Sequence, residues 1–181
     1  MDSFLNEDQQ KTLLTLARRA ITFYLETGEK LKIEASDDSL TEERGVFVTL
    51  KVRDELRGCI GYPIPYKPLF ETVIDAAVSA AAHDFRFQSL EKSELEETRV
   101  EISVLSPPRR IEDVTEIQVG EHGIIISKAG KKGLLLPQVP IEWGWDRETF
   151  LEHGCLKAGL DDKEWKKGAT IEIFSAQVFS E

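Results

Sequence analysis

The sequence has few of the residues on which metal sites and disulfide frameworks depend. It contains two cysteines, Cys59 and Cys155, and three histidines in 181 residues. No C-x-x-C pair occurs, and no two histidines stand at helical spacing, so we expect no zinc or other metal. Two cysteines so far apart also differ from the dense pattern of a disulfide-stapled secreted domain. No motif for a cofactor is present, and we predict none.

Long apolar runs and basic stretches are missing as well. No apolar segment approaches the roughly 20 residues that a membrane-spanning helix needs, and Met1 leads into polar residues rather than a basic and apolar leader. The formal net charge is -10, from 33 acidic and 23 basic residues. Such a charge disfavours nucleic acids and anionic membranes as partners. We therefore expect a cytoplasmic protein that binds neither.

Apolar residues make up 41% of the chain and charged residues 31%, as in soluble globular proteins. The first helix is predicted between Asn6, which stands three residues before Gln9 as in a capping box, and Gly28. Periodicity and turn residues also predict helices at 69–82 and 146–158 with a short piece at 90–97, and strands at 46–52, 56–60, 100–105, 123–127, 134–136 and 170–179.

The most unusual segment is 56–61, Leu-Arg-Gly-Cys-Ile-Gly, which places an arginine and a thiol two residues apart in an apolar strand. We expect it to form the second arm of a hairpin with 46–52. A three-residue turn at 53–55 would pair Val48 with Ile60 and keep the apolar faces together. In that register Arg57 and Cys59 lie on the face opposite to the valines, and Gly61 leaves space there for a neighbour.

Several segments in the same order along the chain resemble the AMMECR domain family, also called AmmeMemoRadiSam system protein A. The matching segments, besides 56–61, are 84–87 (DFRF), 101–107 (EISVLSP), 133–139 (GLLLPQV) and 145–160 (WD to KAGL). The resemblance covers nearly the whole chain. Tyr62 departs from the family pattern, where a small hydroxyl residue is more usual, and Pro140 interrupts a stretch that often lacks proline.

The resemblance implies an α+β fold in which an antiparallel β-sheet is flanked by helices, with a smaller lobe and an inter-lobe groove. It implies one AMMECR-type domain over 1–181. The larger lobe would span about 1–115 plus 160–181, and the smaller lobe about 116–159. Microbial members of this family occur beside a Memo-like protein and a radical-SAM enzyme. A shared modification pathway, with one of these proteins as a partner, is therefore expected.

Cys59 is the candidate catalytic residue, because a guanidinium near a thiol favours the nucleophilic thiolate. The alternative is that Cys59 packs as a small apolar residue. Arg57 is a candidate for binding an anion, with an internal partner such as Asp84 or Glu142 as the alternative. Arg86 has the same two readings, a ligand contact or a salt bridge to a neighbouring acid.

Gly58, Gly61 and Trp143 complete the candidate ligand-binding residues. Together with Arg57 and Arg86 they would line an inter-lobe groove whose floor is the strand at 56–61. The favoured hypothesis is a binding module for an anionic small molecule or a partner protein. The second hypothesis is a thiol-dependent enzyme in a radical-SAM-associated modification pathway, with Cys59 as the nucleophile.

Overall fold

A computed structural model describes residues 5–34 and 38–181. The chain divides into two compact units, described separately below: the first contains Met1–Leu105 and Gln177–Glu181, and the second Ser106–Ala176. Every strand pairing recorded in the described residues is antiparallel, and helices accompany the strands in both units. The fold is therefore α+β, as predicted.

Helix α1, Glu7–Thr27, begins and ends at the residues that the sequence predicts. The side chain of Asn6 accepts the backbone N–H of Gln9, and the side chain of Gln9 accepts the backbone N–H of Asn6. This reciprocal capping box satisfies two N–H groups that a helix start leaves unpaired. Gly28 ends the helix in a left-handed conformation with φ 74°, which glycine adopts without steric cost.

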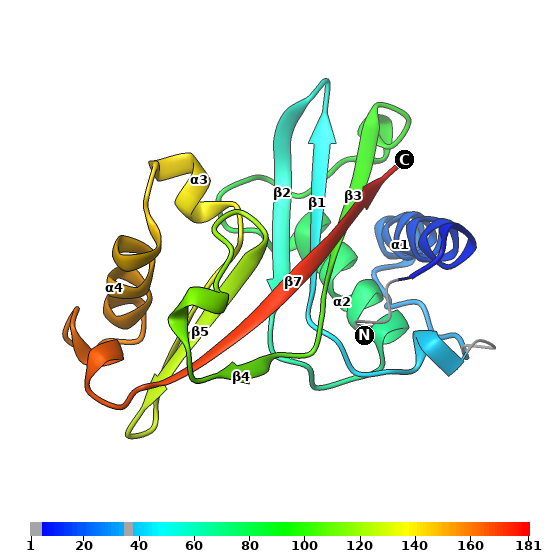
Figure 1. Cartoon of the computed structure of the whole chain (residues 1–181). Helices are drawn as coiled ribbons and strands as arrows, with labels where there is room; N and C mark the ends of the chain where they lie inside the picture. The colour runs from blue at the N-terminus through cyan, green and yellow to red at the C-terminus, as the bar shows by residue number, and fades with distance from the viewer. Residues whose placement is uncertain (1–4, 35–37) are drawn as a thin grey trace. The chain divides into compact units, whose positions relative to one another are not determined.

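The first unit is built on strands β1 (Val46–Val52), β2 (Glu55–Tyr62) and β3 (Thr98–Leu105), in the order β2-β1-β3. Helices α1 and α2 (Leu69–Ala82) lie on one face of these strands (Figure 1). Val46, Val48 and Leu50 of β1 point into the core between the helices and the strands. The alternating residues of β1 are half-buried on the other face, as their period of two requires.

The β1–β2 hairpin differs from the prediction at its tip. The turn has two residues, Arg53 and Asp54, with φ of 52° and 65°, so Val52 pairs with Glu55 rather than Leu56. Two successive positive φ values match the twist of the strands in tight hairpins, which explains why this turn forms without glycine. A bulge then restores the predicted register, with Val48 opposite Ile60.

The second unit contains strands that pair around β7, which runs from this unit into the first. Its helices and strands are β4 (Arg109–Ile111), β5 (His122–Lys128), β6 (Lys131–Leu135), α3 (Val139–Trp143), α4 (Arg147–Lys157) and β7 (Thr170–Ser180). β4 and β5 both pair with β7, and β6 pairs with β5. A separate apolar core, which includes Phe150 and Leu151 of α4, lies against these strands. The sequence did not predict β4 or α3.

Three-residue 3₁₀ turns connect the longer elements at Asp38–Leu40, Lys92–Glu94, Val114–Glu116 and Glu164–Lys166. The predicted helical piece at 90–97 is thus a single short turn. Among the described residues, no helix combines the length and the apolar character that crossing a membrane requires.

Candidate functional site

Gly58 lets helix α2 pack directly on β2. It lies opposite Leu50 on the core face of the hairpin, and a Cβ at this position would stand 2.1 Å from the backbone oxygen of Ala80. No side chain fits there without moving the helix backbone. The structure thus gives Gly58 a role in packing.

Gly61 lies on the other face of β2, opposite Phe47. The neighbour for which its missing side chain leaves room is the ring of Phe47, since a Cβ would stand 2.1 Å from Cδ1 of that ring. The space predicted over Gly61 is therefore filled by this chain itself.

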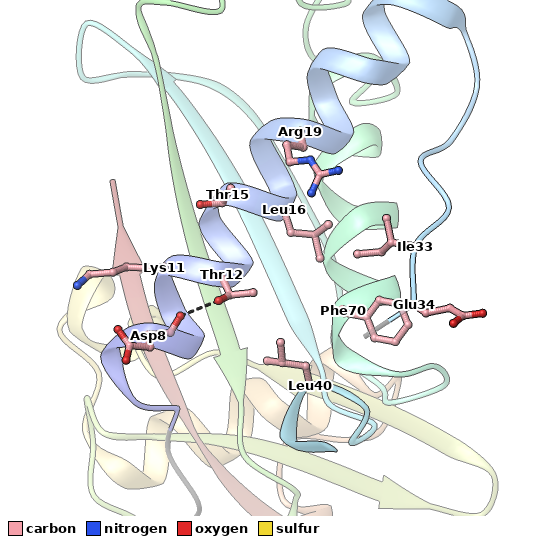
Figure 2. Close-up of a pocket in the computed structure, with 10 residues that line it drawn as sticks. All are labelled: Asp8, Lys11, Thr12, Thr15, Leu16, Arg19, Ile33, Glu34, Leu40 and Phe70. Atoms are coloured by element: carbon pink, nitrogen blue, oxygen red, sulfur yellow. Dashed lines mark hydrogen bonds between the residues drawn. The ribbon is translucent and has the colours of Figure 1, made fainter. Parts of the chain in front are cut away.

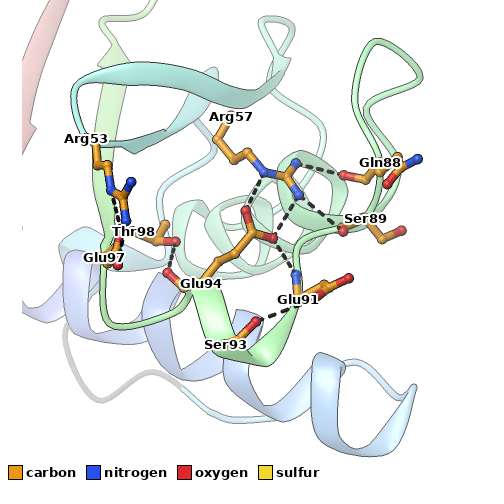
Figure 3. A network of polar contacts seen from close by, with 9 residues as sticks. All are labelled: Arg53, Arg57, Gln88, Ser89, Glu91, Ser93, Glu94, Glu97 and Thr98. Carbon is orange, nitrogen blue, oxygen red and sulfur yellow. Dashed lines mark hydrogen bonds and ion pairs between the residues drawn. The ribbon is translucent and has the colours of Figure 1, made fainter.

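Arg57 is the extra residue of the β2 bulge, because Leu56 pairs with Lys51 while Gly58 pairs with Leu50. Its guanidinium is held by the segment that follows α2 (Figure 3). Nε and Nη2 donate to the two carboxylate oxygens of Glu94 at 2.8 and 2.9 Å. Nη1 donates to the backbone oxygen of Gln88 at 2.7 Å, and Nη2 also donates to that of Ser89 at 3.2 Å.

These contacts use four of the five N–H groups of Arg57. The internal partner is Glu94, so the predicted partners Asp84 and Glu142 are wrong. The Arg57 contact holds the pKa of Glu94 below its ordinary value. A polar cavity of about 520 Å³ adjoins this pair and is also lined by Arg53, Glu55 and Glu97. Arg57 thus ties the hairpin to the segment after α2.

Asp84 and Arg86 form a clamp on the backbone of Cys59. The Asp84 side chain is only 1% exposed. Its Oδ2 accepts a hydrogen bond from the backbone N–H of Cys59 at 2.9 Å and one from Nη2 of Arg86 at 2.7 Å. Its Oδ1 accepts a hydrogen bond from Nε of Arg86 at 2.9 Å. Nη2 of Arg86 also donates to the backbone oxygen of Cys59 at 3.0 Å. Because β2 is the first strand in the sheet order, these side chains replace the neighbouring strand that an edge lacks.

The clamp leaves part of the Arg86 guanidinium available. Its side chain is 46% exposed, and no hydrogen bond within the described residues uses the two N–H groups of Nη1. The Arg86 guanidinium and then the backbone N–H of Cys59 hold the pKa of Asp84 well below its ordinary value, although burial opposes them. Asp84 is therefore a buried anion that orients Arg86 beside β2.

The Cys59 thiol is half-buried and lies on the face of the hairpin away from the valines, as predicted. Its cross-strand neighbour is Thr49, whose hydroxyl donates to Sγ at 3.2 Å. None of the hydrogen bonds recorded for the described residues joins a histidine to this sulfur. The site therefore combines a thiol, a hydroxyl donor and the half-exposed guanidinium of Arg86.

Trp143 belongs to the second unit and is 70% exposed at the end of α3. Its ring stacks on Trp145, with centroids 6.1 Å apart, and Trp145 stacks on His153 at 3.8 Å. Trp145 packs against the core of its unit. The predicted inter-lobe groove, with Trp143 as one wall, stays a prediction. No cluster of three or more metal-ligating side chains occurs in the part of the chain that the structure describes.

Comparison with known proteins supports the resemblance seen in the sequence. The family model described as AMMECR1 matches residues 14–179. The chain belongs to the AMMECR1 family. Protein MK0488 of Methanopyrus kandleri is 48% identical over 100% of this chain and 92% of its own length. A protein of Methanothermobacter thermautotrophicus is 43% identical over 98% of this chain and 96% of its own length.

The AMMECR1 fold is also known from a crystal structure of an uncharacterized protein, PH0010 of Pyrococcus horikoshii. It is similar to this chain with a TM-score of 0.82 and 42% identity, over 98% of this chain and 93% of that one. These relatives establish the family and the fold of this chain.

Sequence reasoning identified Cys59 and Arg86 but not how Asp84 joins them. The available signal was the spacing of Asp84 and Arg86, which lets a carboxylate and a guanidinium meet across one turn. The alternative reading of Arg86, a salt bridge to a neighbouring acid, is what the structure shows. Nothing in the sequence showed that the same carboxylate would reach the backbone of β2.

Proposed function

We propose that this AMMECR1 family member is a binding module that holds a small anion beside Cys59. The observation that carries the proposal is the Arg86 guanidinium, which a buried Asp84 orients while the N–H groups of Nη1 stay uncommitted. A preoriented guanidinium offers paired donors to a carboxylate or phosphate and loses little entropy on binding. The Thr49 hydroxyl and the Cys59 thiol would contact the same ligand.

Arg86, rather than Arg57, would contact the ligand. Arg57 already donates four of its five N–H groups to Glu94 and two backbone oxygens, so an anion would find only one N–H free and would have to break existing contacts to gain paired donors. A Memo-like or radical-SAM protein as partner stays a prediction from the family resemblance. Such a partner would add a protein contact to the proposed site without changing the chemistry of Arg86.

The test compares the variants Arg86→Lys and Arg57→Lys with the wild type by isothermal titration. The probes are inorganic phosphate, citrate and a panel of metabolite carboxylates. Lysine at 86 keeps an ion pair with Asp84 but removes the free N–H groups of Nη1. We expect at least one anion to bind the wild type and Arg57→Lys equally, and Arg86→Lys roughly tenfold more weakly. Absence of binding to the wild type, or an equal loss in both variants, contradicts the proposal.

The second candidate is a thiol-dependent enzyme with Cys59 as nucleophile, and the hydroxyl of Thr49 favours it. The Thr49 hydroxyl donates to Sγ at 3.2 Å and would hold the sulfur in one orientation for attack on a substrate. The test is the rate of Cys59 carboxymethylation in folded wild type and in Thr49→Val. Fast reaction in the folded wild type that slows in the variant supports it. Reaction that requires denaturant excludes it.

A further inference from the structure

A separate cavity of about 460 Å³ lies in the first unit, away from β2. One helical face of α1 forms a wall, and the segment at residues 33–34, Leu40 and the start of α2 form the remainder (Figure 2). Its floor is apolar and consists of Leu16, Ile33, Leu40 and Phe70, of which only Ile33 is more than slightly exposed. The volume falls in the range of sites for small molecules, roughly 300–1,000 Å³.

Four charged residues line this cavity, Asp8, Lys11, Arg19 and Glu34, and Arg19 is the one whose charged group is directed towards the apolar floor. Figure 2 draws its guanidinium on the side of Leu16 and Ile33, whereas Asp8 and Lys11, which also line the cavity, turn their charged ends away from those two residues. Glu34 lines the opposite wall and points outward. No ion pair recorded for the described residues involves Arg19, so its charge is available above an apolar surface.

Fixed contacts hold the walls of the cavity in place. Lys30, at the start of the segment that leads to Ile33, donates to the buried Asp75 of α2 at 2.6 Å, and Ile33 itself packs against the core. The side chain of Gln9 on α1 donates to the Ser39 hydroxyl, next to Leu40, at 2.6 Å. These contacts lower the ordering cost of binding for the parts of the wall that they tie down.

We propose that this cavity binds a small amphipathic carboxylate. The carboxylate would pair with Arg19, and the apolar body would cover Leu16, Ile33, Leu40 and Phe70. Charge complementarity favours an anion, because among the four charged lining residues Arg19 directs its charged group towards the apolar floor and the other three turn theirs away. An apolar body is required because water on the floor gains no hydrogen bonds from these side chains, and its release favours binding.

The experiment titrates octanoate and its uncharged analogue octanamide into wild type, Arg19→Gln and Lys11→Gln, with affinities from NMR shift changes. Lys11 is the matched control, because it is a cation of the same helix that also lines the cavity but turns its ammonium away from Leu16 and Ile33. We expect octanoate to bind the wild type roughly three- to tenfold more tightly than octanamide, as a partly exposed ion pair allows. Arg19→Gln should abolish that preference, and Lys11→Gln should keep it.

Equal binding of the two probes to the wild type overturns the proposal, as does an equal loss of preference in both variants or no binding of octanoate. Both substituted residues are exposed on α1, and glutamine is a good helix former, so the variants should fold. The site at Cys59 is separate, so Arg86→Lys should bind octanoate as the wild type does.

Discussion

Two arginines make contacts along β2 and differ in how the protein uses them: Arg57, which belongs to the strand, and Arg86, which lies beside it. At the bulge, Arg57 is 19% exposed and meets Glu94 and two backbone oxygens. At Cys59, Arg86 is 46% exposed, meets Asp84 and one backbone oxygen, and retains unused donors. The charge is the same in both regions. What separates a structural arginine from an available one is how many of its N–H groups the protein has already satisfied.

The largest expected effect concerns the packing of α2 on β2, which occurs at Gly58. Gly58→Ala places a Cβ against the backbone oxygen of Ala80, so α2 must move, at a cost of about 3 kcal/mol in the free energy of unfolding. Gly61→Ala meets the ring of Phe47 instead, and a side chain can shift, so we expect about 1 kcal/mol. Urea denaturation measures both. Equal costs would contradict the close approach of α2 to β2.

Asp84→Ala is expected to have the next largest effect, because it removes the acceptor for Cys59 N–H and for Arg86. Leaving those donors unpaired should lower the free energy of unfolding by about 2–3 kcal/mol. Asp84→Asn keeps the shape and one acceptor oxygen, and should lose less. Urea denaturation at neutral pH compares the three proteins, and an Asp84→Ala protein as stable as the wild type would refute the clamp.

The pH dependence of the same residue gives a sharper test. The folded pKa of Asp84 is held below its unfolded value, mainly by Arg86. Its contribution to stability is therefore fully present above the unfolded value of about 3.9 and is lost as the pH falls further. The stability difference between wild type and Asp84→Asn should be constant from neutral pH to about 5 and shrink below about 4. A difference that grows on acidification contradicts the assignment.

Arg57→Gln should cost less, about 1–2 kcal/mol, since its partner Glu94 is 29% exposed and can be rehydrated. The matched control is Arg53→Gln. Arg53 pairs with Glu97 in the wall of the same polar cavity but is exposed, so we expect no measurable change in Tm. If the two variants melt alike, Arg57 does not tie the hairpin to the segment after α2.

The smallest expected effect concerns chemical labelling, which compares the accessibility of the two cysteines without a substitution. Cys155 of the second unit is fully buried, and burial raises its thiol pKa. Cys59 is half-buried. Iodoacetamide should therefore label Cys59 in the folded protein and Cys155 only after unfolding, as peptide mass spectrometry can show. Labelling of Cys155 first would reverse the comparison.

Much of the first unit could be predicted because its signals are local. The capping residue Asn6, the terminating Gly28 and the alternation of β1 determine structure over a few neighbouring positions. The hairpin tip was mispredicted because Arg53 and Asp54 adopt positive φ without the glycine or asparagine that usually indicates such a turn.

The candidate site was only partly predictable for a different reason. Cys59 and Arg86 attract attention by residue type, but their relation depends on Asp84, which lies 25 residues from Cys59. Glu94 meets Arg57 across 37 residues. Contacts between residues so far apart in the sequence depend on how α2 returns the chain to β2. No pattern of neighbouring residues shows which distant residues will meet.

Strand β7 has a consequence for how the chain reaches its folded state. Residues 177–181 belong to the first unit although 71 residues of the second unit precede them. There Gln177 bonds to the backbone of Leu5, Glu181 pairs with Arg18, and the N–H of Glu181 bonds to Val100. During synthesis the first unit lacks these contacts until the second unit has left the ribosome. Its completion is thus a late step governed by loop closure over a long chain.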